Sequence, residues 1–349
     1  MIDLEGLLIR AGEKLASDVH MTVGLPPVLR IDGALVDDGI PALTEEDVYG
    51  CAKELCTDKQ LRELKEEGEV DFAVTAPNHI RIRCNIYRQQ GNTAIALRLL
   101  PEEIPTCQQL ELPDILVEQA EKPRGLVLVT GPTGSGKSST LAALINHINH
   151  TRRRHVITLE APIEYIHRRV MCVIDQREVG TDTKSFAAGL RAALRQDPDV
   201  ILVGEMRDLE TISTAITAAE TGHLVFGTLH TKGAANTIDR IIDVFPAEQQ
   251  EQVRIQLADV IECAVGQTLL PKIGGGQVAV FEVMTVNPAV QNLIRDGRTH
   301  QIDNAIFGGT GQGMISMDNE LQRLYRAGVI SKDVAITYAV SPETLSKRL

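Results

Sequence analysis

The possible folds of this chain are limited most strongly by a glycine-rich segment of eight residues, 131–138. It reads G-P-T-G-S-G-K-S and lies between a short apolar run, residues 126–129, and a segment of helical composition, residues 139–148. In that setting the pattern G-x-x-x-x-G-K-S is a P-loop, whose glycines let backbone N–H groups turn inward around a phosphate. A chance glycine-rich turn is the alternative, but it would have to match eight positions and both flanking elements.

The P-loop predicts ATP and Mg²⁺ as ligands. The helix after the loop offers its positive N-terminal end, and Lys137 is expected to neutralise oxygens of the β- and γ-phosphates. The hydroxyl of Ser138 is expected to bind Mg²⁺. We therefore expect the nucleotide to be held by Gly131, Pro132, Thr133, Gly134, Ser135, Gly136, Lys137, Ser138 and Ser139.

Short apolar runs recur along the rest of the chain and predict a parallel sheet. Residues 126–129, 156–159, 200–203 and 224–228 are apolar, and segments of helical composition separate them. Continuous apolar strands of this kind are buried on both faces, with helices covering the sheet from either side. We expect this α/β domain to cover residues 121–349 and to become mainly helical from about residue 285.

The first 100 residues predict a separate small α+β domain, because a chain of 349 residues is long enough for two cores. Apolar side chains at helical spacing predict one helix over residues 4–16 and a second over residues 44–66, which opens at Thr44. Several segments with alternating apolar residues predict strands. Three prolines mark residues 101–120 as a linker.

A P-loop needs an acidic partner at the end of a neighbouring strand, and Glu205 is the candidate. Gly204 and Glu205 follow the apolar strand at 200–203, and Gly204 stands where most P-loop enzymes have an aspartate. Glu205 is expected to hold Mg²⁺ through water, to orient the attacking water, or both. The alternative is a surface glutamate that caps a turn.

A second acidic pair, Glu160 and Glu164, follows the strand at 156–159. Carboxylates at the carboxyl ends of parallel strands face the ligand crevice in open α/β sheets. We predict that Glu164 is the general base for the water that attacks the γ-phosphate. Glu160 fits a structural role equally well.

Two histidines, His223 and His230, flank the apolar run that begins at residue 224. A neutral imidazole near a γ-phosphate can respond to its loss, so we predict His230 as a catalytic residue and His223 as a nucleotide contact. They are poor candidates for metal ligands, because no third ligand is spaced nearby. A hydrogen-bonded structural histidine is the alternative at each position.

Arginines gather on one face of a strand predicted at residues 80–87. Alternation puts Arg81 and Arg83 on that face, and Arg98 ends the partner strand. A polar face of this kind is often simply solvated. The functional alternative is that these arginines reach a nucleotide bound by a neighbouring subunit and offset charge in the transition state. Further candidates for the same role are Arg191, Arg195 and Arg207.

The acidic composition argues against a nucleic-acid partner. The chain has 47 acidic and 35 basic residues, a formal net charge of −12, which disfavours nonspecific binding to nucleic acid or anionic lipid. The six cysteines form no C-x-x-C pair, so no metal cluster is expected. The first residues lack the pattern of a signal peptide, and no apolar run approaches the roughly 18 residues of a membrane span, so we expect a cytoplasmic protein.

Four segments together give the chain a family resemblance. They are the P-loop, the acidic segment ITLEAPIEY at 157–165, the segment LRQDPDVILVGEMRD at 194–208 and the histidine segment TGHLVFGTLHT at 221–231. The match extends through AANTIDRIIDVFP at 234–246 and QTLLPK at 267–272. Over essentially its whole length the chain resembles the secretion ATPase superfamily, and within it the type IV pilus retraction ATPases.

The resemblance implies a PAS-like N-terminal domain, a RecA-like motor domain and hydrolysis of ATP coupled to mechanical work. It also implies a ring-shaped homohexamer with ATP bound between the domains. Such a motor acts at the cytoplasmic base of the pilus machine, peripheral to the inner membrane. Its implied partners are an inner-membrane platform protein and, indirectly, the pilin machinery; no nucleic acid is expected.

Two positions depart from the pattern of that family. Ala161 stands where the acidic segment usually has aspartate, and Gln291 stands where the retraction motif A-I-R-N-L-I-R-E has its first arginine. A pilus-extension or type II secretion ATPase is the nearest alternative, but those relatives carry further N-terminal domains and a tetracysteine zinc module. A non-hydrolysing accessory subunit is an alternative from a different class.

Overall fold

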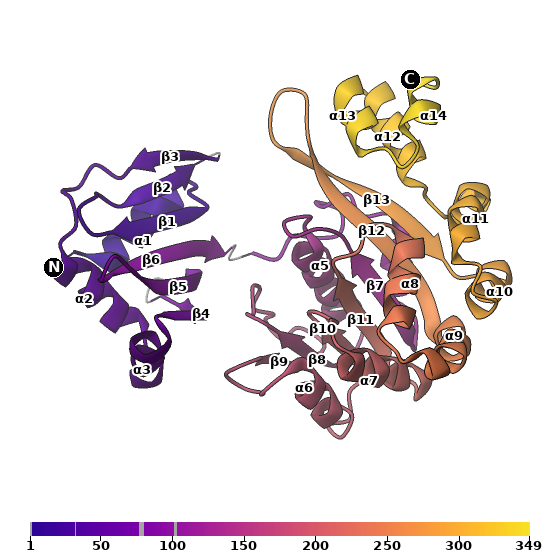
Figure 1. Ribbon diagram of the computed structural model, residues 1–349, viewed down its shortest axis with the longest axis horizontal. Helices are drawn as coiled ribbons and strands as arrows, with labels where there is room; N and C mark the ends of the chain where they lie inside the picture. Colours follow the sequence, from indigo (N-terminus) through magenta and orange to yellow (C-terminus); the bar gives the residue numbers. More distant parts are fainter. Residues whose placement is uncertain (1, 32, 77–79, 101–102) are drawn as a thin grey trace. The chain divides into compact units, whose positions relative to one another are not determined.

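The computed structural model describes residues 2–31, 33–76, 80–100 and 103–349, which form two compact units (Figure 1). The first, called the N-terminal unit here, comprises Met1–Glu103 together with Pro162–Ile166. The second, the C-terminal unit, comprises Ile104–Ala161 and His167–Leu349. Each unit has its own sheet and its own apolar core, so each is described by itself.

The N-terminal unit is built on an antiparallel sheet in the order β3-β2-β1-β6-β5-β4. Buried and partly buried residues alternate along β1 and most of β5, so one face packs on the helices and supplies a single apolar core. Its strands are β1 (Asp18–Thr22), β2 (Val28–Ile31), β3 (Ala34–Asp37), β4 (Glu69–Thr75), β5 (Arg81–Gln89) and β6 (Asn92–Leu100). Its helices are α1 (Leu4–Glu13), α2 (Glu45–Leu55) and α3 (Asp58–Glu67).

The single helix predicted over residues 44–66 is wrong, because α2 ends at Leu55 and α3 begins at Asp58. Thr57 starts the second helix with a capping box of its own. Its hydroxyl accepts a hydrogen bond from the backbone N–H of Gln60, and the Gln60 side chain accepts one from the backbone N–H of Thr57. The cap satisfies the backbone N–H groups of Thr57 and Gln60, which favours the start of a new helix over one continuous helix. The start predicted at Thr44 is confirmed by the same kind of cap.

The C-terminal unit is an α/β layer structure, as predicted. Its sheet has the order β13-β12-β7-β11-β10-β8-β9, parallel throughout except that β13 runs antiparallel to β12. All residues of the central strands β7, β10 and β11 are buried. The strands are β7 (Gly125–Thr130), β8 (His155–Glu160), β9 (Val173–Glu178), β10 (Val200–Val203), β11 (Leu224–Leu229), β12 (Ile261–Pro271) and β13 (Gln277–Thr285).

Helices cover this sheet on both faces, and a separate apolar cluster forms under each layer. One cluster includes residues of α4 (Asp114–Gln119) and α5 (Lys137–Thr151). The other includes residues of α6 (Phe186–Ala193), α7 (Leu209–Glu220), α8 (Ala234–Asp243) and α9 (Ala247–Val260). The P-loop helix α5 and the helix α8 that follows the histidine segment therefore lie in different layers.

The end of the chain is helical, as expected. Asn287 caps α10 by accepting a hydrogen bond from Val290 N–H, Pro288 takes the first helical position, and Gly297 follows the helix with φ of 68°. The helices are α10 (Pro288–Arg295), α11 (Ile302–Gly308), α12 (Met317–Arg326), α13 (Lys332–Tyr338) and α14 (Pro342–Ser346). Among the described residues, no helix has the length and apolarity that crossing a membrane requires.

Candidate nucleotide site

Three of the predicted site segments meet at one edge of the C-terminal sheet. Thr130, the last residue of β7, pairs with Leu229, the last residue of β11, and β10 lies on the other side of β11. Because the strands are parallel, the P-loop, His230 and Glu205 all leave the sheet at its carboxyl edge. The backbone N–H of Gly131 donates to the Leu229 carbonyl at 3.3 Å, which joins the start of the P-loop to the residue before His230.

Two glycines of the P-loop adopt backbone conformations that other residues rarely adopt. Gly131 has φ of 146°, and a Cβ atom there would lie 2.1 Å from the Gln267 carbonyl oxygen of β12. At Gly136, with φ of 86°, a Cβ atom would lie 2.9 Å from the Gln267 side-chain nitrogen. Gln267 is also fixed to α5, because Thr140 Oγ1 donates to its Oε1 at 2.9 Å. The loop is thus packed directly on β12.

The loop has the features that a phosphate group needs. Helix α5 begins at Lys137 with no side-chain cap in the described structure, so the N–H groups of its first turn suit an anion. The Ser135 hydroxyl is buried without a hydrogen-bond partner among the described residues. Lys137 Nζ donates to the carbonyl oxygens of Gly131 at 2.8 Å and Pro132 at 2.9 Å, which holds the charged group across the loop. These residues fit the predicted nucleotide.

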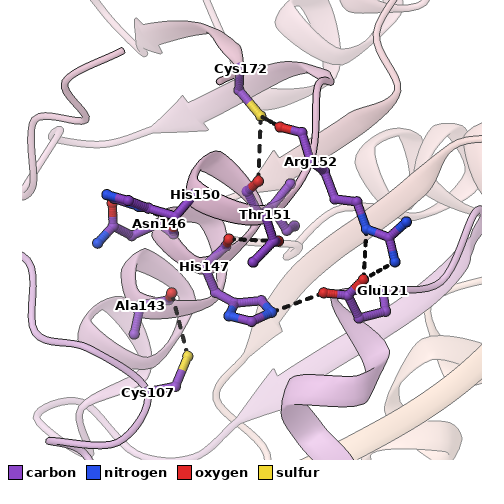
Figure 2. A network of polar contacts seen from close by, with 10 residues as sticks. Cys107, Glu121, Ala143, Asn146, His147, His150, Thr151, Arg152 and Cys172 are labelled. Atoms are coloured by element: carbon purple, nitrogen blue, oxygen red, sulfur yellow. Dashed lines mark hydrogen bonds and ion pairs between the residues drawn. The ribbon is translucent and has the colours of Figure 1, made fainter. Parts of the chain in front are cut away.

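The far end of α5 is anchored by a polar network within the same unit (Figure 2). The Glu121 carboxylate contacts His147 Nε2 at 2.9 Å and forms an ion pair with Arg152, and the Arg152 hydrogen bond is the main reason that the pKa of Glu121 is lowered. Cys172 Sγ lies 3.3 Å from the Arg152 carbonyl oxygen, and Cys107 Sγ lies 3.5 Å from that of Ala143. These contacts hold the helix that carries the P-loop.

Glu205 and His230 are in direct contact at the carboxyl edge of the sheet. His230 Nε2 lies 2.8 Å from Glu205 Oε1, and the Arg207 guanidinium pairs with the same carboxylate. The side chain of Glu205 is 19% exposed, so the carboxylate is oriented by two partners yet reachable from solvent. A cavity of about 420 Å³ opens beside this pair, and it is lined by Glu205, Met206, Arg207, Leu229, His230, Thr231 and Arg240.

The two glutamates of the acidic segment have different surroundings. Glu160 ends β8, and its carboxylate accepts hydrogen bonds from Thr158 Oγ1 at 2.6 Å and Gln176 Nε2 at 3.1 Å, which supports the structural alternative. Glu164 belongs to the N-terminal unit. Its role as general base therefore stays a prediction.

The predicted arginine fingers have partners inside the N-terminal unit. Arg83 forms an ion pair with Asp71 at 2.6 Å, and its pKa is raised by that hydrogen bond first and by the nearby Glu164 charge as well. Arg81 Nε donates to the Ile163 carbonyl at 3.2 Å. Arg98 pairs with Asp18 at 2.9 Å, and in the C-terminal unit Arg191 pairs with Glu210. A role across subunits stays a prediction for all of them.

The structure does not bring His223 to the P-loop. His223 precedes β11, and its carbonyl accepts a hydrogen bond from the backbone N–H of Gly125 at the start of β7. It therefore lies at the amino edge of the sheet, the opposite edge from the phosphate loop. Its Nδ1 lies 2.8 Å from the Ala218 carbonyl oxygen, as the structural alternative expects.

Sequence reasoning missed several residues that support the site. Gln267 lies in the QTLLPK segment and Arg240 in the AANTIDRIIDVFP segment, and the sequence shows both segments only as parts of a family resemblance. The sequence assigns neither residue a role, because a buried glutamine and a helical arginine have no local pattern that indicates function. Gln267 accepts its hydrogen bond from Thr140 on α5, and Arg240 lines the cavity beside Glu205, so both meet residues that are distant in sequence.

Comparison with known proteins gives consistent matches over the full chain. Residues 57–320 match the family model described as type II/IV secretion system protein. Over 342 residues the chain is 45% identical to the type IV pilus retraction ATPase PilT of Pseudomonas aeruginosa, covering 98% of this chain and 99% of that protein. It is 46% identical over 321 residues to a twitching motility protein of Neisseria gonorrhoeae, covering 92% of this chain and 86% of that protein.

A solved structure agrees with the sequence matches. The fold is similar to the crystal structure of the pilus retraction motor PilT with bound ADP, with a TM-score of 0.94 and 46% identity. The match covers 100% of both chains. The similarity thus extends to both units and not to the P-loop region alone.

Proposed function

The chain belongs to the type II/IV secretion system protein family, and on that basis we propose that it is a hexameric ATPase motor that powers type IV pilus retraction. The observation that carries the proposal is the meeting of the P-loop, Glu205 and His230 at one sheet edge. The end-to-end similarity to a pilus retraction ATPase supports the same activity and the same cellular task.

The P-loop and the first turn of α5 bind the phosphates of ATP. Lys137 exchanges its contacts with two loop carbonyls for oxygens of the β- and γ-phosphates, and the backbone N–H groups of the loop surround the β-phosphate. Ser138 and, through water, Glu205 would hold Mg²⁺. When bound, Mg²⁺ neutralises charge on the phosphates.

Water attack on the γ-phosphate is the chemical step. Glu205 accepts a hydrogen bond from the attacking water, while His230 and Arg207 hold its carboxylate in place. Glu164 accepts the proton as the water oxygen bonds to phosphorus and the bond to the β-phosphate oxygen breaks, leaving ADP and phosphate. Arg81, Arg83 and Arg98 offset charge on a nucleotide in the neighbouring subunit, after releasing their partners within the unit.

The proposed motor is a homohexamer of chains that each have a domain at 1–100, a linker at 101–120 and a motor domain at 121–349. It acts in the cytoplasm at the pilus base, against an inner-membrane platform protein, and it drives pilin back into the membrane. The departures at Ala161 and Gln291 leave the hydrolytic residues intact, since one lies in an exposed position after β8 and the other on α10.

Deleting the gene in the native host and counting surface pili tests this function. Many pili that never retract are expected, and complementation with the wild-type gene should restore retraction whereas Lys137→Ala should not. Cells without pili would instead indicate an assembly motor of the extension or type II secretion kind. Unchanged pili together with no ATP turnover by the purified protein would indicate a non-hydrolysing accessory subunit.

A further inference from the structure

Three threonine hydroxyls connect the two segments that form the candidate site. Thr130 is the residue before the P-loop, Thr231 is the residue after His230, and Thr237 lies one turn into α8. Thr237 Oγ1 is 2.7 Å from Thr231 Oγ1 and 3.4 Å from Thr130 Oγ1. Thr130 and Thr237 are both completely buried, so this contact is shielded from water.

The proton of each hydroxyl can be assigned from its other partners. Thr130 Oγ1 donates to the Val265 carbonyl at 3.1 Å, and Thr237 Oγ1 donates to the Gly233 carbonyl at 2.7 Å. A hydroxyl has one proton to donate and two lone pairs. Thr231 must therefore donate to Thr237, which leaves Thr237 as the acceptor that holds the residue next to His230.

Other contacts hold the loop between His230 and α8 at the start of the helix, among them the hydrogen bond from Asn236 Nδ2 to the Lys232 carbonyl at 2.8 Å. Gly233 begins α8 with φ of 80° and no side-chain cap. Ala234 N–H donates instead to Oε1 of Glu282, a buried carboxyl group on β13, at 2.8 Å. The Glu282 contact thus fixes the start of α8 from β13, and the hydrogen bond from Thr231 to Thr237 holds the loop against α8. His230, whose Nε2 lies 2.8 Å from Glu205 Oε1, is the residue just before this loop.

We propose that Thr237 is a positioning residue for ATP hydrolysis, which keeps His230 in contact with Glu205 by tying Thr231 to α8. This inference rests on the proposed ATPase function. Thr237 does not reach the cavity, which is lined by its neighbours Thr231 and Arg240. Its loss should therefore slow the chemical step and leave nucleotide binding unchanged.

The test compares Thr237→Val with Thr237→Ser in the full-length protein. The valine variant keeps the shape and loses the hydroxyl, so kcat should fall at least about tenfold, since a misplacement of about 1 Å can cost about a hundredfold. KM for ATP and the Kd for ADP should not change. The serine variant keeps the hydroxyl and should restore kcat. A valine variant with the kcat of the wild type would overturn the inference.

A double-mutant cycle separates positioning from a general structural effect. If Thr237 acts through His230, then Thr237→Val should have little further effect on kcat in a His230→Gln background. An equal loss in both backgrounds would mean that Thr237 acts independently of His230 and would overturn the inference. The control is Thr211→Val on α7, which removes a buried hydroxyl that donates to Asp208 at 2.7 Å. This variant should leave kcat unchanged.

Hydrogen exchange provides a readout that does not depend on activity. Amide protons of residues 230–234 should exchange faster in Thr237→Val than in the wild type or Thr237→Ser, with the P-loop amides unchanged. If Thr237→Val does not fold, Thr231→Val removes the same 2.7 Å contact from the loop side and should lower kcat in the same way. A wild-type protein without ATP turnover would contradict the proposed function, whereas turnover that both valine variants retain would contradict only the role of Thr237.

Discussion

His230 Nε2 lies 2.8 Å from Glu205 Oε1, and this contact joins the residue after β11 to the residue two beyond β10. The Glu205 carboxylate also pairs with Arg207. Its contacts with both His230 and Arg207 fix the direction in which the carboxylate can accept a further hydrogen bond. A carboxylate held in this way at the carboxyl edge of a parallel sheet suits the orientation of an attacking water.

Glu205→Gln should lower kcat for ATP by about a hundredfold or more, the scale of a lost catalytic carboxylate, while nucleotide binding is retained. The amide keeps the size of the side chain but lacks the negative charge that orients the attacking water and helps to hold Mg²⁺. Steady-state turnover and ADP titration measure the two effects separately. Glu248→Gln, an exposed glutamate on α9, is the control. Loss of nucleotide binding in Glu205→Gln would assign the residue to holding the metal instead.

Lys137→Ala should abolish ATP turnover and weaken nucleotide binding, because it removes the charge that the P-loop holds between the Gly131 and Pro132 carbonyls. Binding of a fluorescent ATP analogue and phosphate release are the measurements. Lys184→Ala, an exposed lysine in the same unit, should behave like the wild type. Turnover close to that of the wild type in Lys137→Ala would remove the basis for the P-loop assignment.

Arg83→Ala should lower ATP turnover by about a thousandfold or more if Arg83 acts as an arginine finger, with P-loop binding retained. Asp71→Asn is the matched control, since it breaks the same 2.6 Å ion pair but leaves the arginine in place. Asp71→Asn should keep most of the activity. Equal losses in the two variants would show that only the ion pair matters.

Mixed hexamers test whether the arginine acts across subunits. Subunits that carry both Arg81→Ala and Arg83→Ala are mixed with Lys137→Ala subunits. Part of the turnover should return, because the first type supplies an intact P-loop and the second type supplies the arginines. The measurement is ATP turnover against the mixing ratio. Turnover that never exceeds that of the separate variants would confine the arginines to their own subunit.

Asp38→Asn should destabilise the protein at pH 7 and much less at pH 3. Burial alone would raise the pKa of the Asp38 carboxyl, but the ion pairs with Arg10 at 2.7 Å and Lys14 at 2.9 Å outweigh it and lower the pKa below its ordinary value. Stability from a lowered carboxyl pKa is present above the unfolded-state value, about 3.9, and is lost as the pH falls through the folded-state value.

The expected decrease in Tm at pH 7 is about 4 °C, the shift that about 1 kcal/mol produces in a domain of 60–100 residues. Thermal unfolding of wild type and variant at both pH values measures it. Asp37→Asn changes the exposed neighbouring carboxylate and is the control. The same decrease at pH 3 as at pH 7 would contradict the ion-pair explanation.

Local patterns predicted those parts of the fold that depend on local interactions. The strand before the P-loop, the helix after it and the caps at Thr44 and Asn287 were all readable, because each involves residues within a few positions of one another. The break at Thr57 was readable in principle, since Thr57 and Gln60 have the spacing of a capping box. Helical composition on both sides of the break hid that signal.

The supporting residues of the site could not be predicted, because their partners are far apart in sequence. Thr140 and Gln267 are separated by 127 positions, and Thr130 and Thr237 by 107. A buried threonine or glutamine has no periodic or spacing pattern of its own. Thr140 lies on α5 and Thr237 on α8, and only the packing of these helices on the sheet brings their side chains next to Gln267 and Thr130.

By itself, the sequence determined the phosphate loop, the α/β class and the set of acidic, histidine and arginine candidates, because each is a local pattern of residue types. The tertiary structure decided which candidates meet. His223 and His230 flank one strand of six residues, about 20 Å long, so only His230 reaches the carboxyl edge where the P-loop and Glu205 lie. Strand direction and pairing, which depend on the packing of the whole sheet, made that selection.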